Sequence, residues 1–334
     1  MKKTVLLLLA ATIYLSIFLV SCGENSASEL PEFFLASEIS EEVRNDAEKT
    51  LSAFMQAFEE DDAKAAISLL SDGFECTEDE LSAFFTELSN LVESPFVPFD
   101  AYYMNNLEVS DALIRVKKDE NSKDYIELTP ASRELYCAMY ASEGDLTSYM
   151  MTLLLTREGG DFKVAWINPS DFKFGGNDAP AFYEKTLSLY REEKLIPAYV
   201  SSCMLSNVLR PGGYFRYEKD VEMEDLCYKL YSEVSDTFAL PLELKDTSSS
   251  VLYEISITKD AERGVIPLIR FKTNVSVSDE PALKEECMRV TAALEKLSPG
   301  MAEVSEYVCF DATNDEIAET PAPVNSKKII LSLR

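Results

Sequence analysis

Apolar residues recur at helical spacing near the start of the chain. With Ser40 as N-cap, they predict a helix over 40–60. A short helix is expected over 63–70, and the capping-box pattern from Thr77 to Glu80 opens a third helix. The positions that form the apolar face of the first helix are Val43, Ala47, Leu51, Phe54 and Phe58.

The pattern changes after Pro98, where short β-branched and aromatic runs replace the helical spacing. The last two expected strands are joined at Gly159-Gly160, a pair typical of a hairpin turn. Three helices followed by a largely antiparallel sheet form an α+β domain. The five strands are expected over 112–117, 125–128, 134–142, 148–157 and 162–167.

A second group of elements follows Gly175-Gly176, which we interpret as a domain boundary. It begins with helices over 179–192, 197–209 and 221–238, and continues with a ββαββ unit over 251–334. Pro267 shifts the strand expected over 266–275 toward a sheet edge, because proline cannot donate a ladder hydrogen bond. The predicted organisation is a signal peptide over 1–21, a lipidated tether over 22–39, a first domain over 40–175 and a second α+β domain over 176–334.

The N-terminus has the layout of a secretory signal peptide. Two lysines precede an apolar run from Val5 to Val20, which at 16 residues is shorter than the roughly 20 that span a bilayer. The run ends in Leu19, Val20, Ser21 and Cys22, which resemble the lipobox of bacterial lipoproteins. The resemblance implies cleavage before Cys22 and acylation of Cys22, so that the chain is anchored to a membrane without spanning it. An ordinary signal peptide with an incidental cysteine is the alternative.

This resemblance implies a location at the cell membrane or outer membrane, with the protein facing the periplasm or the exterior. The stretch after Cys22 is polar and acidic and is expected to act as a tether. Phe33, Phe34 and Leu35 interrupt it and are candidates for docking on the folded body.

Three segments of the first domain also carry a resemblance. They are the helix Ala53-Phe54-Met55-Gln56-Ala57-Phe58, the turn Ser71-Asp72-Gly73-Phe74, and the hairpin that ends in Phe162-Lys163-Val164-Ala165-Trp166-Ile167. Together they are similar to NTF2-like (SnoaL-like) domains. The resemblance implies a curved sheet wrapped on helices around a conical pocket, in a family that includes enzymes, binding modules and exported lipoproteins. The second domain looks similar to C-terminal halves of uncharacterised exported proteins, which implies no activity.

Composition removes several classes of function. The chain has 59 acidic and 31 basic residues and no histidine, for a formal charge of −28. Such a charge repels phosphate backbones, which argues against nucleic-acid binding. The absence of histidine excludes catalysis by Ser-His-Asp or Cys-His groups and imidazole metal sites. Neither of the two common glycine-rich nucleotide fingerprints occurs, and no cofactor or metal is expected.

Six cysteines besides Cys22 leave two alternatives open. An even number in an exported protein is compatible with disulfides, and the same residues are equally compatible with buried free thiols. No pair has C-x-x-C spacing, which argues against zinc knuckles and thioredoxin-like chemistry. The six are Cys76, Cys137, Cys203, Cys227, Cys287 and Cys309.

Two further patterns have simple explanations. Ser170–Lys173 and Ser256–Lys259 match S-x-x-K, but the companion motifs of penicillin-binding enzymes are absent, so we interpret both as coincidence. The acidic run Glu59-Glu60-Asp61-Asp62 lacks the spaced ligands of a calcium loop. Residues 23–95 carry 19 acidic and 3 basic residues, which predicts a solvated acidic face.

The sequence therefore predicts a membrane-anchored protein with a non-enzymatic role in ligand binding or in the envelope. In its sharper form this hypothesis places a small apolar ligand in the first domain. One alternative is a hydratase or isomerase that uses tyrosine and carboxyl groups, and another is a protein-partner module with an acidic helical face. The pocket candidates are Asp100, Tyr102, Tyr103, Tyr140, Tyr149 and Trp166.

Overall fold

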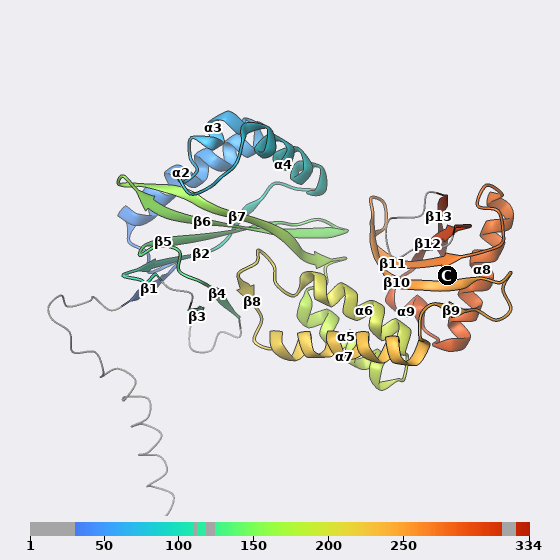
Figure 1. The fold of residues 1–334 in the computed structure, drawn as a ribbon. Helices are drawn as coiled ribbons and strands as arrows, with labels where there is room; N and C mark the ends of the chain where they lie inside the picture. Colours follow the sequence, from blue (N-terminus) through green and yellow to red (C-terminus); the bar gives the residue numbers. More distant parts are fainter. Residues whose placement is uncertain (1–30, 110–111, 118–123, 316–324) are drawn as a thin grey trace, which may run out of the picture.

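The computed structural model describes residues 31–109, 112–117, 124–315 and 325–334 (Figure 1). It confirms the α+β class: helices pack against three mostly antiparallel sheets. The signal peptide and the lipobox, Cys22 included, lie outside the described residues. No helix in the described part is long and apolar enough to cross a membrane.

The first large sheet has the strand order β1-β2-β5-β6-β7 and is antiparallel throughout. The expected hairpin at Gly159-Gly160 is present, with both glycines at positive φ. The strands are β1 (Glu32–Leu35), β2 (Val97–Asn105), β5 (Leu135–Ser142), β6 (Thr147–Glu158) and β7 (Asp161–Phe174).

Two of these strands correct the sequence-based organisation. Strand β2 was not expected, because Tyr102, Tyr103 and Met104 are buried in succession and hide the alternation of a half-exposed strand. Strand β1 lies in the segment assigned to the tether and pairs with β2, Phe34 lying opposite Tyr103. The docking expected of Phe33, Phe34 and Leu35 therefore takes the form of strand pairing.

Helices α2 (Glu41–Glu59), α3 (Ala63–Ile67) and α4 (Glu78–Leu91) cover one face of this sheet. Their N-caps are as expected, since Ser40 caps α2 and Thr77 forms a complete capping box with Glu80. Phe54, Phe85 and Phe162 are almost fully buried between helices and sheet, and Phe54 and Phe85 meet edge to face. Aromatic side chains thus fill this interface.

The opposite face carries a second set of elements. A small sheet is formed by β3 (Ile114–Lys117), β4 (Tyr125–Leu128) and β8 (Phe215–Arg216). Beside it lie α5 (Ala179–Arg191), α6 (Leu195–Val208) and α7 (Asp220–Phe238), close to their expected bounds. One continuous buried cluster joins Met150 of the large sheet, Leu205 of α6 and Phe271 of the second large sheet.

The second large sheet has the order β13-β12-β11-β10-β9 and is packed with α8 (Glu280–Leu297) and α9 (Met301–Val304). Its elements follow one another as β9, β10, β11, α8, α9, β12 and β13, and β11 and β12 are parallel. The strands are β9 (Leu242–Glu243), β10 (Val251–Asp260), β11 (Gly264–Lys272), β12 (Tyr307–Thr313) and β13 (Ser326–Ser332).

The edge position expected from Pro267 is wrong, because β11 lies between β10 and β12. The backbone N–H of Thr273 donates to Thr313 O, on the side of β12. Backbone N–H groups along a strand point alternately to its two neighbours, so the backbone position of Pro267, six residues earlier, also faces β12. The pairing with β12 starts only at Leu268. The missing N–H of Pro267 therefore removes no ladder hydrogen bond.

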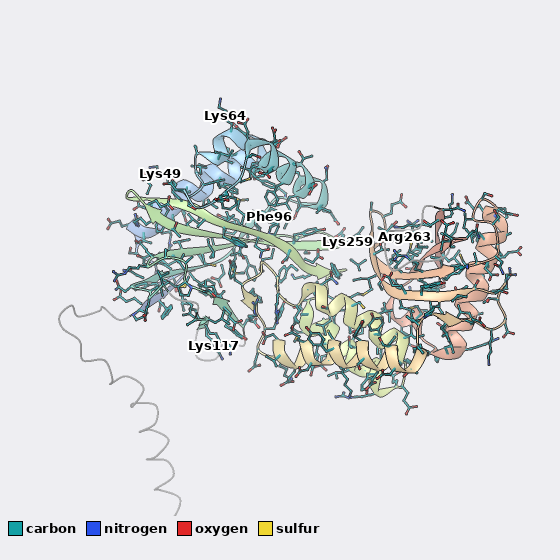
Figure 2. The ribbon with its side chains drawn as sticks, viewed as in Figure 1. Lys49, Lys64, Phe96, Lys117, Lys259 and Arg263 are labelled. Carbon is teal, nitrogen blue, oxygen red and sulfur yellow. The ribbon has the colours of Figure 1, made fainter. Side chains whose placement is uncertain are left out.

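Besides the small sheet and the shared buried cluster, two polar contacts join the two halves at β7. After α6, Gly212 N–H donates to Ser170 Oγ of β7 at 2.6 Å. At the tip of the β10–β11 hairpin, Lys259 Nζ lies 2.6 Å from Asp171 Oδ1 of β7 (Figure 2). The first contact joins the loop after α6 to β7, and the second joins the second large sheet to β7.

Candidate functional site

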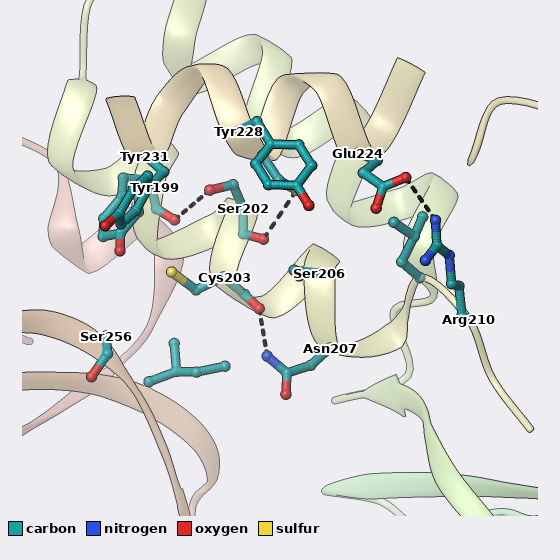
Figure 3. Close-up of a pocket in the computed structure, with 13 residues that line it drawn as sticks. Tyr199, Ser202, Cys203, Ser206, Asn207, Arg210, Glu224, Tyr228, Tyr231 and Ser256 are labelled. Atoms are coloured by element: carbon teal, nitrogen blue, oxygen red, sulfur yellow. Dashed lines mark hydrogen bonds and ion pairs between the residues drawn. The ribbon is translucent and has the colours of Figure 1, made fainter. Parts of the chain in front are cut away.

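An open groove of about 730 Å³ lies between α6, α7 and β10 (Figure 3). We call it the tyrosine groove, because three tyrosines line it. Helices α6 and α7 form its walls, and Ser256 and Ile257 of β10 lie on the opposite side. Its principal side chains are Tyr199, Ser206, Asn207, Arg210, Glu224, Tyr228 and Tyr231.

The register of α7 places two of these tyrosines on its surface. The helix buries Met223, Leu226 and Leu230 on one stripe. Tyr228 and Tyr231 lie outside that stripe and remain 67% and 62% exposed. A large aromatic ring that stays in water on a well-formed helix gains little stability for the fold, which favours a role in binding.

The helices fix the polar groups of the groove. Asn207 Nδ2 donates to Cys203 O at 2.8 Å, one turn back along α6. Arg210 Nη2 donates to Glu224 Oε2 at 2.6 Å and joins the end of α6 to α7. This ion pair leaves the groove without an uncompensated charge at that end.

The two thiols beside the groove are not activated. Burial raises the pKa of Cys203 to about 11, although a hydrogen bond with Tyr199 acts in the opposite direction. Burial also raises the pKa of Cys227 to about 12, and its Sγ donates to Ser202 O at 3.4 Å. Because the thiolate is the reactive form, neither cysteine is poised as a nucleophile at neutral pH.

The pocket candidates named from the sequence do not share one cavity. Asp100 and Tyr140 line a second groove of about 610 Å³ between α2 and strands β2 and β5. Tyr102 faces the other side of the sheet, where its hydroxyl donates to Asp100 Oδ2 at 3.1 Å. Tyr103 donates to Glu134 Oε1 at 3.0 Å.

The remaining two candidates lie elsewhere. Tyr149 is buried, and its hydroxyl accepts a 3.4 Å hydrogen bond from Lys259 Nζ at the contact between the two halves. Trp166 is half exposed on β7. Asp100 and Tyr140 both border the second groove, but the Asp100 carboxylate lies on the side of the sheet that Tyr102 faces. The structure therefore brings no two of the candidate side chains together as a site, and burial raises the pKa of Tyr140 to about 12.

The S-x-x-K matches have structural partners. Ser170 accepts from Gly212, and Lys173 Nζ lies 3.0 Å from Glu143 Oε1. Ser256 Oγ donates to Glu254 Oε1, while Lys259 pairs with Asp171. The first match lies in β7, which runs beyond the expected end at residue 167 to Phe174. Neither match places serine and lysine together as a nucleophile and base.

The part of the chain that the structure describes contains no candidate metal site and no disulfide. No group of three or more acidic or cysteine side chains there is arranged to hold a metal ion. All six cysteines that follow the lipobox are free thiols, which is one of the two alternatives that the sequence left open.

Sequence reasoning missed the tyrosine groove. Tyr199, Tyr228 and Ser256 are distant in sequence and meet only through the packing of α6, α7 and β10. A signal was present in α7 alone: Tyr228 and Tyr231 fall outside the apolar stripe of a strongly periodic helix.

Comparison with known proteins adds no relative: no protein-family model, curated protein or solved structure matches this chain.

Proposed function

We propose that this chain is an exported, lipid-anchored envelope protein that acts by binding a ligand in the tyrosine groove, without catalysing a reaction. The observation that carries the binding role is the exposure of Tyr228 and Tyr231 on a groove of about 730 Å³. Binding pockets of this size are typical for small ligands and for short segments of larger ones. The lipobox from Leu19 to Cys22 supports the anchor.

The place proposed for the ligand differs from the one expected from the sequence. A small apolar ligand in the first domain requires space between its helices and its sheet. Phe54, Phe85 and Phe162 fill the buried part of that interface, and the space that remains beside α2 is the second groove of about 610 Å³. The tyrosine groove is open and lies outside this packing, so it is the better-supported site.

A hydratase or isomerase with a tyrosine and a carboxyl group is a weaker candidate. Asp100 and Tyr140 both border the second groove, but their side chains lie on opposite faces of the sheet. A general acid works best when its pKa lies near the working pH, and burial moves the pKa of Tyr140 away from neutrality, to about 12. The acidic face of the first helices remains a candidate surface for a basic protein partner, supported by exposed Glu59, Glu60 and Asp61.

The anchor is tested by Cys22→Ala. We expect the variant to be released from the membrane fraction or to remain unprocessed, because it lacks the acceptor thiol for the acyl chains. Fractionation of expressing cells and a mass measurement of the purified chain distinguish these states. Normal processing and full membrane retention of Cys22→Ala would contradict the lipid anchor.

The groove is tested by native mass spectrometry of the full chain purified from an expressing cell. We expect a bound species that is lost in the double variant Tyr228→Ala, Tyr231→Ala. The matched control is Asp100→Asn, Tyr140→Phe in the second groove, which should retain the species. A bound mass that persists in the first variant and disappears in the control would move the site to the second groove.

A further inference from the structure

The polar groups that the tyrosine groove offers to a ligand are uncharged. Among the described residues, the hydroxyls of Ser206, Tyr228 and Tyr231 have no hydrogen-bond partner within the protein. The side-chain amide of Asn207 donates from Nδ2 to Cys203 O, and its Oδ1 is available as an acceptor. The groove thus presents three hydroxyls and one amide oxygen to the solvent.

The charges nearby disfavour anionic ligands and offer a cationic ligand no unpaired carboxylate among the described lining residues. Glu224 is the one carboxylate among the described lining residues, and it is paired with Arg210 at 2.6 Å. A chain with a formal charge of −28 repels anions, so Arg210 in this pairing is a poor anion site. The complementary ligand is therefore polar, rich in hydroxyl or amide groups, and without net charge.

The two exposed tyrosines add a flat apolar component. They are three residues apart on α7, which spaces them by about 4.5 Å along the helix axis. The face of an aromatic ring carries negative charge density and attracts weakly positive C–H groups. A pyranose ring offers a face of such C–H groups, polarised by its oxygens, and a rim of hydroxyls.

We propose that the tyrosine groove binds a chain of uncharged sugars, with sugar rings stacked on Tyr228 and Tyr231 and their hydroxyls bonded to Ser206 and Asn207. This inference rests on the proposed binding function and names its ligand class. An amphipathic helix fits less well, because Ser206 and Asn207 make α6 polar where such a helix needs apolar contact.

The test is calorimetric titration of the full chain in detergent with three neutral oligosaccharides: chitohexaose, cellohexaose and maltohexaose. We expect at least one to bind. Tyr228→Ala and Tyr231→Ala should each weaken binding about ten-fold, the loss of one aromatic contact. Tyr228→Phe should stay within about three-fold of the original, since the ring remains. Salt should leave the affinity unchanged, because the ligand carries no charge.

Val221→Ala is the matched control, an exposed position on the same helix outside the groove. It should leave the affinity unaltered. Circular dichroism of each variant verifies that α7 is intact.

The outcomes separate this inference from the proposed function. If none of the three sugars binds, or if the alanine variants bind as well as the original chain, the sugar assignment is overturned. A basic peptide that binds in a Tyr228-dependent and salt-sensitive manner would overturn it too, while leaving the groove as a binding site. If native mass spectrometry also finds no bound species that depends on Tyr228 and Tyr231, the proposed binding function is overturned together with the sugar assignment.

Discussion

At Gly213, glycine is required for both conformational and steric reasons. Gly213 has φ +75°, in the region that side chains rarely adopt, and a Cβ at this position would lie 2.2 Å from Asn168 Nδ2 of β7. The loop after α6 can approach the first sheet this closely only because the residue has no side chain.

We expect Gly213→Ala to lower the free energy of unfolding by about 2–4 kcal/mol, combining backbone strain with the clash. Urea denaturation measures the change. Gly175→Ala is the matched control, since Gly175 also has positive φ but no neighbouring atom within 4 Å of an added Cβ. It should cost only about 1–2 kcal/mol. Equal losses in both variants would show that the contact with Asn168 is unimportant.

At the scale of elements, a buried carboxylate attaches a loop to a helix. Glu286 of α8 is fully buried, and its Oε1 accepts from Ser250 Oγ at 2.5 Å and from Ser248 N–H at 2.7 Å. Its Oε2 accepts from Arg289 Nε at 2.7 Å. Burial raises the pKa of Glu286, but the hydrogen bonds from Ser250 and Arg289 outweigh burial and hold the pKa below its usual value.

Because the pKa is lower in the folded state, the ionised carboxylate stabilises the fold above the usual glutamate pKa of about 4.3. This stabilisation is lost as the pH falls through the folded pKa. Glu286→Gln should lower the free energy of unfolding at neutral pH by about 1.5–3 kcal/mol. The difference in the free energy of unfolding between this variant and the original chain should become smaller at acid pH.

Urea titrations at several pH values test this expectation. Glu285→Gln, a neighbouring exposed position, is the control and should change stability little at any pH. A gap that stays constant from neutral to acid pH would show that the charge of Glu286 does not contribute.

The sequence predicts an element correctly when the residues that fix its start lie close together in the chain. Ser40 and Thr77 fix the starts of α2 and α4 through contacts three residues away, so sequence alone locates them. Strand β2 and the central place of β11 depend on neighbours distant in the chain, as Tyr102 and Pro267 show. The tyrosine groove has the same origin: its walls meet only when α6, α7 and β10 pack together.

At the scale of the molecule, the two halves share one hydrophobic core. Leu205 of α6 is fully buried in a cluster that extends from Met150 in the first sheet to Phe310 in the second. Halves that share buried side chains are expected to unfold together and not as independent domains.

We expect one coincident urea transition, seen by the fluorescence of Trp166 in the first half and by hydrogen exchange of α8 in the second. Leu205→Ala should lower both midpoints together, at a cost of about 2–5 kcal/mol for the cavity. A change in the urea midpoint reported by one probe but not by the other would show that the halves unfold separately.

The pairing of β1 with β2 sets the reach of the lipid anchor that we propose. With the anchor that we propose at Cys22, only ten residue steps lead to Glu32, where β1 begins. Even fully extended they span at most about 35 Å. Because β1 is held in the first sheet, the start of the folded body would then stay within that distance of the bilayer.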